Sequence, residues 1–323
     1  MKTTMKAAVI AAPQRLEMQE VPLPRAEKGE IVVKIEGCGV CASNVPPWEG
    51  RDWFSYPMAP GQLGHEAWGT VHEIGAGVTL FQLGQRVAML SNHAYAPFDK
   101  AEASAVVALP ETLQDAPFPG EPVGCAFNIF RRSGIKSGDE VAIVGIGFLG
   151  ALLTQLAKNA GATVYAISRR PFSLDFARSF GADEIIEMDE NWRVIEVVKN
   201  LTQGRFCDVV IEAVGKQAPL DLSAELCRER GRLVVAGFHQ DGMRQINMQL
   251  WNWRGLDVIN AHEREQHVYI EGIAAAAEQV AAQKMTPQSL YTHHFPLERL
   301  GEALELTRTR PDGFMKALIA MES

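Results

Sequence analysis

The sequence lacks the features of a general nucleic-acid-binding or membrane-embedded protein. Its 31 lysines and arginines are outnumbered by 39 aspartates and glutamates. The formal net charge of -8 provides no basic surface to neutralise a phosphate backbone, which disfavours nucleic-acid binding. The most apolar helical stretch, residues 270–282, is interrupted by Glu271 and Glu278 and falls short of the roughly 20 apolar residues that a bilayer span needs. We therefore expect no nucleic-acid partner and no membrane-spanning segment.

Cysteines are also few, and no secretory leader is visible. The first residues carry Lys2 and Lys6 but no apolar signal core, so secretion is not expected. The five cysteines are odd in number and scattered, which fits a reducing cytoplasm better than a disulfide framework: Cys38, Cys41, Cys125, Cys207 and Cys227. We expect a cytoplasmic protein.

The 323 residues are 47% hydrophobic, which is enough for a large core and for two domains. The first 120 residues contain short β-type runs separated by glycine and proline, and they predict a compact β-rich domain. These runs are residues 6–11, 31–36, 67–74, 86–89 and 105–109.

From residue 139 onward, predicted strands alternate with predicted helices, which favours βαβ units and a parallel sheet. The strands are expected at residues 141–144, 163–167, 184–186, 208–211 and 232–236, and the helices at 149–159, 173–180, 192–201 and 218–227. After residue 260 the pattern changes to helices at 268–283 and 297–307 and a final strand at 317–321. Periodicity alone does not assign that strand to either domain.

A glycine-rich loop follows the first strand of this alternation. Gly145, Gly147 and Gly150 form G-I-G-F-L-G, with Phe148 and Leu149 at the start of the next predicted helix. Such glycines permit a tight turn, close approach of the backbone to a pyrophosphate, and close packing of helix on strand. The helix N-terminus adds N–H groups and a positive dipole end. The loop therefore predicts a dinucleotide site rather than a structural turn.

The residues that would read the cofactor's ribose lie about 20 positions further on, where an NAD-binding protein usually has an acidic residue. Here the strand ends with Ser168, Arg169 and Arg170. A hydroxyl and two guanidinium groups suit a 2′-phosphate, because they attract its charge. We expect NADP(H) rather than NAD(H); the alternative is that both arginines are solvated loop charges.

Three short segments carry side chains that could bind a metal. They contain Cys41, His65 with Glu66, and Glu121. A thiolate, an imidazole and one or two carboxylates could hold Zn²⁺ tetrahedrally and leave a position open for substrate. Taken singly, such residues are more often packing or surface side chains.

The order of these motifs resembles the zinc-dependent medium-chain dehydrogenase/reductase family, which includes the alcohol and sorbitol dehydrogenases. G-x-C-x-S, G-H-E, an E-P turn before R-R-x-G, G-x-G-x-x-G and a terminal F-P-L-E segment carry the resemblance over essentially the whole chain. It implies an α/β protein: a GroES-like β-rich catalytic domain at residues 1–121, a Rossmann domain with a doubly wound parallel sheet at 122–265, and a return segment at 266–323 that completes the catalytic domain.

The resemblance also implies roles for individual residues. Cys41 and His65 match the first two ligands of the catalytic zinc. Glu66 matches a carboxylate that is a direct ligand in the polyol branch, and Glu121 lies beside the third ligand position, which favours that branch. Whether both carboxylates bind zinc stays open. Ser43 matches the residue whose hydroxyl accepts the proton of the substrate alcohol.

Three departures from the family pattern are visible. Asn44 replaces the more usual aspartate after Ser43. Residues 91–109 contain no cysteine, so the lobe that binds a structural zinc is absent and one Zn²⁺ per chain is expected. Val45, Pro46 and Pro47 replace the histidine that often continues the proton relay, so the sequence assigns no proton route beyond Ser43.

The other cysteines and the remaining histidines are interpreted as structural. Cys38 is expected to pack in a strand, and Cys125, Cys207 and Cys227 to be inert core thiols inside helices or strands. His93 lies where the shortened loop could border the substrate site. Residues 251–259 are interpreted as packing or as a subunit contact of a homodimer or homotetramer.

The resemblance and the motifs together predict reversible NADP-linked oxidation of a secondary alcohol of the polyol, cyclitol or sugar-like class to a ketone. Zn²⁺ would polarise the substrate oxygen and the nicotinamide would accept the hydride. Two alternatives share the fold: a zinc-independent reductase of alkenes or quinones, and a non-catalytic NADP(H)-binding sensor.

Overall fold

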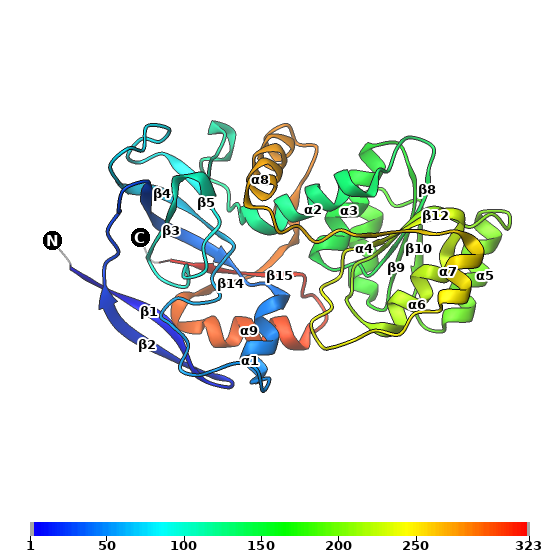
Figure 1. Cartoon of the computed structure of the whole chain (residues 1–323), viewed down its shortest axis with the longest axis horizontal. Coiled ribbons are helices and arrows are strands. Elements are labelled where there is room, and N and C mark those ends of the chain that lie inside the picture. The colour runs from blue at the N-terminus through cyan, green and yellow to red at the C-terminus, as the bar shows by residue number, and fades with distance from the viewer. Residues whose placement is uncertain (1–2, 322–323) are drawn as a thin grey trace. The chain divides into compact units, whose positions relative to one another are not determined.

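The computed structural model describes residues 3–321 and contains two compact units (Figure 1). The first unit comprises residues 1–125 and 265–323, and the second comprises residues 126–264. The division falls within helix α2 (Gly120–Ser133). The chain therefore leaves the first unit and returns to it after completing the second.

The first unit is built around a seven-stranded sheet. Its strand order is β14-β15-β3-β4-β5-β7, with β6 paired to β3, and β1 and β2 form a separate antiparallel pair. The strands are β1 (Thr4–Ala12), β2 (Arg15–Pro22), β3 (Glu30–Gly39), β4 (Ala67–Ile74), β5 (Arg86–Met89), β6 (Phe98–Glu102), β7 (Val106–Ala108), β14 (Tyr291–Pro296) and β15 (Lys316–Ala320). The helices are α1 (Val45–Glu49), α8 (Gln266–Ala281) and α9 (Leu300–Thr309). Because β15 pairs with both β14 and β3, the final strand belongs to this unit.

Strand β3 lies inside this sheet, paired with β15, β4 and β6, and most of its residues are buried. Ile31, Val33 and Ile35 are almost completely buried, together with Val87 of β5 and Ile319 of β15. Burying each such side chain contributes about 1.5 to 3 kcal/mol relative to leaving it in water. The core therefore fixes β3 and β4, whose ends carry the candidate metal ligands.

The second unit is a six-stranded parallel sheet with the order β10-β9-β8-β11-β12-β13. Its strands are β8 (Glu140–Val144), β9 (Thr163–Ser168), β10 (Glu184–Glu187), β11 (Cys207–Glu212), β12 (Cys227–Val235) and β13 (Asp257–Asn260). Its helices are α3 (Phe148–Asn159), α4 (Pro171–Ser179), α5 (Asn191–Leu201), α6 (Gln217–Leu226) and α7 (Met248–Arg254). Since right-handed crossovers run outward from β8 in both directions, helices cover both faces of the sheet (Figure 1).

This arrangement confirms the expected α/β class with a parallel, doubly wound sheet. It corrects the region around Glu121 and Pro122: no E-P turn exists there, because α2 begins at Gly120. Proline is compatible with the first helical turn, where its missing N–H has no intrahelical partner to lose. No helix in the described part of the chain is long and apolar enough to cross a membrane.

Candidate metal and dinucleotide sites

Three side chains in the first unit form a group that could hold a metal ion. The ligand atoms of Cys41, His65 and Glu66 all lie within 4.8 Å of one another. Cys41 follows β3, and His65 and Glu66 precede β4. Because the two strands are antiparallel, with Cys38 opposite Ala67, the end of one strand meets the beginning of the other.

Hydrogen bonds orient both the imidazole and the thiol. His65 Nδ1 lies 2.8 Å from the backbone oxygen of Leu63, and since a carbonyl only accepts, Nδ1 carries the hydrogen. Nε2 is then the nitrogen left to bind a metal, which would displace the proton held there in its absence. The backbone N–H of Ser43 donates to Cys41 Sγ at 3.5 Å.

The electrostatics of this group favour a bound cation. Burial lowers the pKa of His65, but the hydrogen bond with Cys41 and the charges of Cys41, Glu121 and Glu66 outweigh it and raise the pKa to about 10. The surrounding anionic groups thus stabilise positive charge at this point. A thiolate, an imidazole and a carboxylate are also the donor types of catalytic zinc sites, so the residues present fit the ion.

Glu66 is completely buried and paired with a lysine. Lys316 Nζ lies 2.7 Å from Glu66 Oε1 and 2.5 Å from Oε2. Burial lowers the pKa of Lys316, but the charge of Glu66 outweighs it and raises the pKa above its usual value. Gly39 makes room for the carboxylate, because a Cβ there would be 1.9 Å from Glu66 Oε2. Lys316 therefore neutralises the charge of a candidate ligand. The sequence did not predict this lysine as a partner of Glu66.

Glu121 lies near the metal group but is not one of the three mutually close residues. Burial raises the pKa of its carboxyl group, and the charge of His65 and, to a smaller extent, a hydrogen bond with Tyr269 of α8 oppose this. Cys125 lies one helical turn later on α2 and contacts the same tyrosine. Burial and the charge of Glu121 raise the pKa of its thiol. Cys125 is thus half-buried rather than part of the core, and because burial raises the pKa of its thiol, the expectation that it is inert stays a prediction.

Ser43 and Asn44 lie two and three residues after the first candidate ligand, Cys41. The Ser43 hydroxyl lies 3.5 Å from Asn44 Oδ1, to which it donates. Asn44 is buried, and its amide donates to the Leu63 oxygen at 3.3 Å and to Tyr95 Oη at 2.6 Å. Asn44 thus donates a hydrogen bond to the same Leu63 carbonyl that orients His65, and accepts one from Ser43.

The glycine loop has the shape that a pyrophosphate requires. Gly145 has a φ of +102°, and its N–H donates to the Ile167 oxygen at 2.8 Å. A Cβ at Gly150 would be 2.0 Å from the Gly145 oxygen, whereas a Cβ at Gly147 would meet nothing within 4 Å. The loop is therefore tightly packed on one side and open at Gly147, where α3 presents its N-terminus.

The expected ribose-reading residues lie at the end of β9. Ser168 is 6% exposed, and its Oγ accepts a hydrogen bond from the Arg170 N–H at 3.3 Å, which leaves the hydroxyl hydrogen to donate elsewhere. Arg169 is exposed, and Arg170 occupies the N-cap position of α4. Ser168, Arg169 and Arg170 thus place one hydroxyl donor and two guanidinium groups at neighbouring positions at this strand end, a set of donors that suits a phosphate.

Comparisons with known proteins identify the family. The alcohol dehydrogenase GroES-like domain matches residues 27–114, and the zinc-binding dehydrogenase domain matches residues 149–278. An alcohol dehydrogenase of Geobacillus stearothermophilus is 31% identical over 268 residues, which cover 72% of this chain and 77% of that protein. The chain belongs to the zinc-type medium-chain dehydrogenase family. It is an alcohol dehydrogenase, an oxidoreductase that acts on alcohols.

Other relatives of this alcohol dehydrogenase agree with that assignment. A sorbitol dehydrogenase of Halalkalibacterium halodurans is 26% identical over 319 residues, covering 88% of this chain and 90% of that one. A crystal structure described as a zinc-binding dehydrogenase from Sinorhizobium meliloti 1021 bound to NADP covers 99% of this chain and all of its own, with a TM-score of 0.85. At 24% identity the latter supports the fold alone.

The remaining cysteines and His93 of the dehydrogenase lie outside the metal group. Cys38, Cys207 and Cys227 are buried, as the sequence suggests. Cys227 is the first residue of β12, a strand that begins five residues before its expected start. His93 is exposed, and its backbone N–H donates to Asp99.

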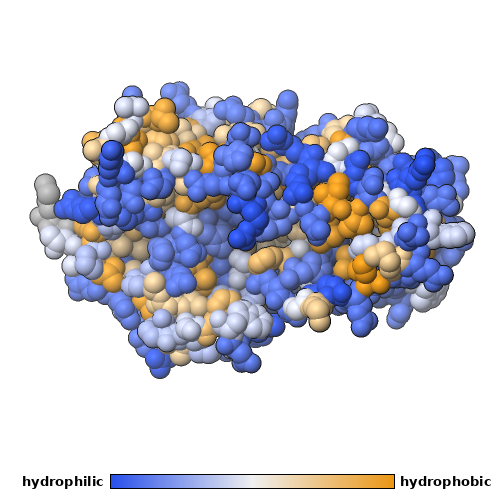
Figure 2. Space-filling model, viewed as in Figure 1, coloured by the Kyte–Doolittle hydropathy of each residue, from blue (hydrophilic) through white to orange (hydrophobic). Residues whose placement is uncertain are grey.

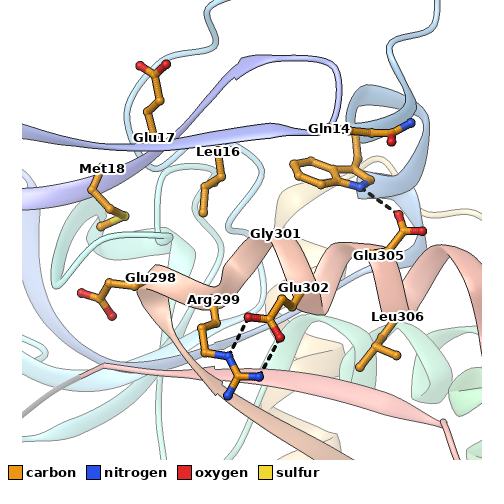
Figure 3. Close-up of a pocket in the computed structure, with 11 residues that line it drawn as sticks. Gln14, Leu16, Glu17, Met18, Glu298, Arg299, Gly301, Glu302, Glu305 and Leu306 are labelled. Carbon is orange, nitrogen blue, oxygen red and sulfur yellow. Dashed lines mark hydrogen bonds and ion pairs between the residues drawn. The ribbon is translucent and has the colours of Figure 1, made fainter.

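A groove of 610 Å³ lies elsewhere in the first unit (Figure 3). It runs between β2 and α9 and is lined by Glu17, Glu298, Glu302 and Glu305 among others. Glu302 pairs with Arg299 through two hydrogen bonds of 2.7 and 2.6 Å. None of the lining residues belongs to the metal or dinucleotide groups, so this groove is not part of the proposed catalytic apparatus.

Proposed function

We propose that this dehydrogenase oxidises a secondary alcohol of the polyol-like class reversibly, with NADP(H) and one zinc ion per chain. The observation that carries the proposal is the group formed by Cys41, His65 and Glu66, in a chain that also has the G-I-G-F-L-G loop. Cys41, His65 and one carboxylate, Glu66 or Glu121, would hold the ion and leave a fourth position open. When bound, the ion supplies Lewis-acid activation of the alcohol oxygen and the nicotinamide supplies the hydride acceptor.

Ser43 is proposed as the acceptor of the substrate's proton. It lies two residues after Cys41, and its hydroxyl already donates to Asn44 Oδ1 at 3.5 Å. A hydroxyl can accept one proton while passing its own to a base or to solvent water; the Asn44 amide oxygen accepts the hydrogen bond of Ser43 and orients it, but does not take the proton. Asn44 keeps Ser43 in place, because its own amide is fixed by the Leu63 oxygen and Tyr95.

The preference for NADP(H) rests on Ser168, Arg169 and Arg170. Ser168 carries no charge to repel a 2′-phosphate, and the two guanidinium groups can pair with it. The polyol-like substrate class rests on Glu66 and Glu121 and on the relatives named sorbitol dehydrogenase. We also propose a cytoplasmic location, because all five cysteines are free thiols.

Two measurements on the purified protein test the proposal. Elemental analysis should find about one zinc per chain. A panel of polyols, cyclitols and simple alcohols should then give NADPH absorbance with at least one secondary alcohol. Cofactor binding without turnover of any panel member would instead support the sensor, and zinc-free reduction of an alkene or quinone would support the reductase.

A further inference from the structure

A buried carboxylate ties together the two loops that follow β11 and β12. Glu212, the last residue of β11, is completely buried. Its Oε1 accepts hydrogen bonds from the backbone N–H groups of Val214 and Gly215, each at 2.8 Å. Its Oε2 lies 3.0 Å from His239 Nε2, in the loop after β12. One side chain thus fixes the positions of both loops.

The hydrogen bonds through His239 run in one direction. Arg244 Nε donates to His239 Nδ1 at 2.9 Å. A guanidinium group only donates, so Nδ1 is the acceptor and the hydrogen of the neutral imidazole is on Nε2, where it is donated to Glu212. Arg244 also donates to the Gly215 oxygen at 3.0 Å and pairs with Asp241. Each hydrogen bond in the series from Arg244 through His239 to Glu212 therefore has one donor and one acceptor only if Glu212 Oε2 accepts.

These loops lie beside the glycine loop. A Cβ on Gly145 would be 2.3 Å from Val214 Cγ2, and the Ala213 N–H donates to the Val144 oxygen at 2.9 Å. In the sheet, β9 with Ser168 lies on one side of β8, and β11 and β12 lie on the other. A dinucleotide spans the carboxyl ends of the strands where the strand order reverses. With the 2′-phosphate at Ser168, the nicotinamide half extends toward β11 and β12.

We propose that Arg244, His239 and Glu212 are positioning residues, which hold the loops after β11 and β12 in the shape that binds the nicotinamide half of the cofactor. This inference rests on the proposed function. Phe238, next to His239, is 56% exposed and stacks on His262 with the ring centres 5.9 Å apart. The series, which is anchored on the buried Glu212, thus also positions the exposed Phe238 at the end of β12.

Glu212→Gln tests the direction of the series. The new side chain keeps one oxygen for Val214 and Gly215 but places an NH₂ group against the N–H of His239. We expect the dissociation constant of NADPH to rise about tenfold, as for a lost hydrogen bond to a charged group, while that of adenosine 2′,5′-bisphosphate stays within about twofold. The fluorescence of bound NADPH, which reports on the nicotinamide, should move toward that of free NADPH.

Arg244→Met is the second variant, because it removes the first donor and leaves the buried carboxylate and imidazole paired. We again expect weaker binding of NADPH and nearly unchanged binding of adenosine 2′,5′-bisphosphate. This variant decides the test if Glu212→Gln does not fold. Arg193→Met is the matched control: it removes an exposed arginine of the same unit, paired with Asp189, and should change neither ligand. Equal weakening of both ligands in Arg244→Met, or no weakening of either, overturns the inference. If the unmodified protein binds neither ligand, the proposed cofactor fails instead.

Discussion

Cys41 is the sulfur ligand of the proposed zinc site, and its loss should separate metal binding from cofactor binding. Cys41→Ala removes the thiolate, so we expect the zinc content to fall to near zero and turnover to be abolished. NADPH binding should persist, because the glycine loop belongs to the other unit. Elemental analysis and NADPH titration measure the two effects.

Cys38→Ala is the matched control for that substitution. Cys38 lies three residues earlier and is buried against Glu66 and Gly39, without belonging to the metal group. The Cys38→Ala protein should retain its zinc. A metal-free preparation of the unmodified protein with full alcohol dehydrogenase activity would contradict the zinc assignment.

The cofactor preference depends on the side chains at the end of β9. Charge-assisted hydrogen bonds contribute about 1.5 to 3 kcal/mol each, so Arg169→Ala should weaken NADP(H) by roughly one to two orders of magnitude and change NAD(H) little. Ser168→Asp should reverse the preference, since it adds repulsion for the phosphate and an acceptor for a free ribose hydroxyl. Dissociation constants of both cofactors measure the effects. Equal weakening of NADP(H) and NAD(H) by Arg169→Ala would show that the arginine is only a loop charge.

At the residue scale, the sequence predicts a site when the residues that form it are close together in a short motif. The glycine loop and the pair formed by His65 and Glu66 can be recognised because their members are neighbours in the chain. Lys316 could not be predicted, since it meets Glu66 across 250 positions. His239 and Glu212 are 27 positions apart, one in the loop after β12 and the other at the end of β11, so no short motif links the histidine to its carboxylate.

At the scale of elements, Asp183 connects three parts of the second unit. Just before β10, it accepts hydrogen bonds from Lys158 Nζ of α3 and from the Val164 N–H of β9, both at 2.7 Å. Burial raises the pKa of Asp183, but these two bonds outweigh it and lower the pKa below its usual value. A depressed pKa means that the carboxylate stabilises the fold above its unfolded-state pKa of about 3.9, and that this stability is lost as the pH falls through the folded-state pKa.

Asp183→Asn should therefore lower the free energy of unfolding at pH 7 by about 1 kcal/mol, a value reduced for solvent screening because the side chain is partly exposed. The deficit should shrink as the pH falls below about 4. Urea unfolding of both proteins across this range measures it. Asp175→Asn, which removes an exposed carboxylate paired with Arg178, should change little. A deficit that grows on acidification would contradict this reading.

Elements with strong patterns could be predicted from sequence, and weakly patterned or short ones could not. The strands at 67–74 and 86–89 have the expected bounds, because runs of apolar residues end at turn-forming ones. Helix α7 was missed because its seven residues bury none of their side chains. Its ends nevertheless carry signals: Asn247 caps the Leu250 N–H, and Gly255 adopts the left-handed conformation.

At the scale of the whole molecule, the second unit has an open sheet edge that suits pairing with a second copy. Strand β13 pairs with β12 on one side, and no strand in the described part of the chain pairs with its other side. Exposed edges pair readily with other chains. Trp253, on the neighbouring α7, is 84% exposed and Met248 is 57% exposed, and Figure 2 shows hydrophobic areas among the hydrophilic surface of this unit. We propose a twofold symmetric homodimer, alone or within a tetramer, in which two β13 strands meet.

Trp253→Glu should dissociate this dimer. A tryptophan at an interface typically contributes about 2 kcal/mol, so its loss together with an added charge should weaken association by roughly 30-fold or more. Ile259→Lys should act in the same direction, because a lysine on an edge strand opposes pairing. Trp192→Glu is the matched control: Trp192 is 67% exposed on α5 of the same unit, away from β13 in the strand order.

Sedimentation of the unmodified protein at micromolar concentration should give at least twice the chain mass of 35.5 kDa, and the same measurement on Trp253→Glu should give the single-chain mass. A single-chain mass for the unmodified protein, or dissociation by Trp192→Glu alone, would rule out β13 as the contact.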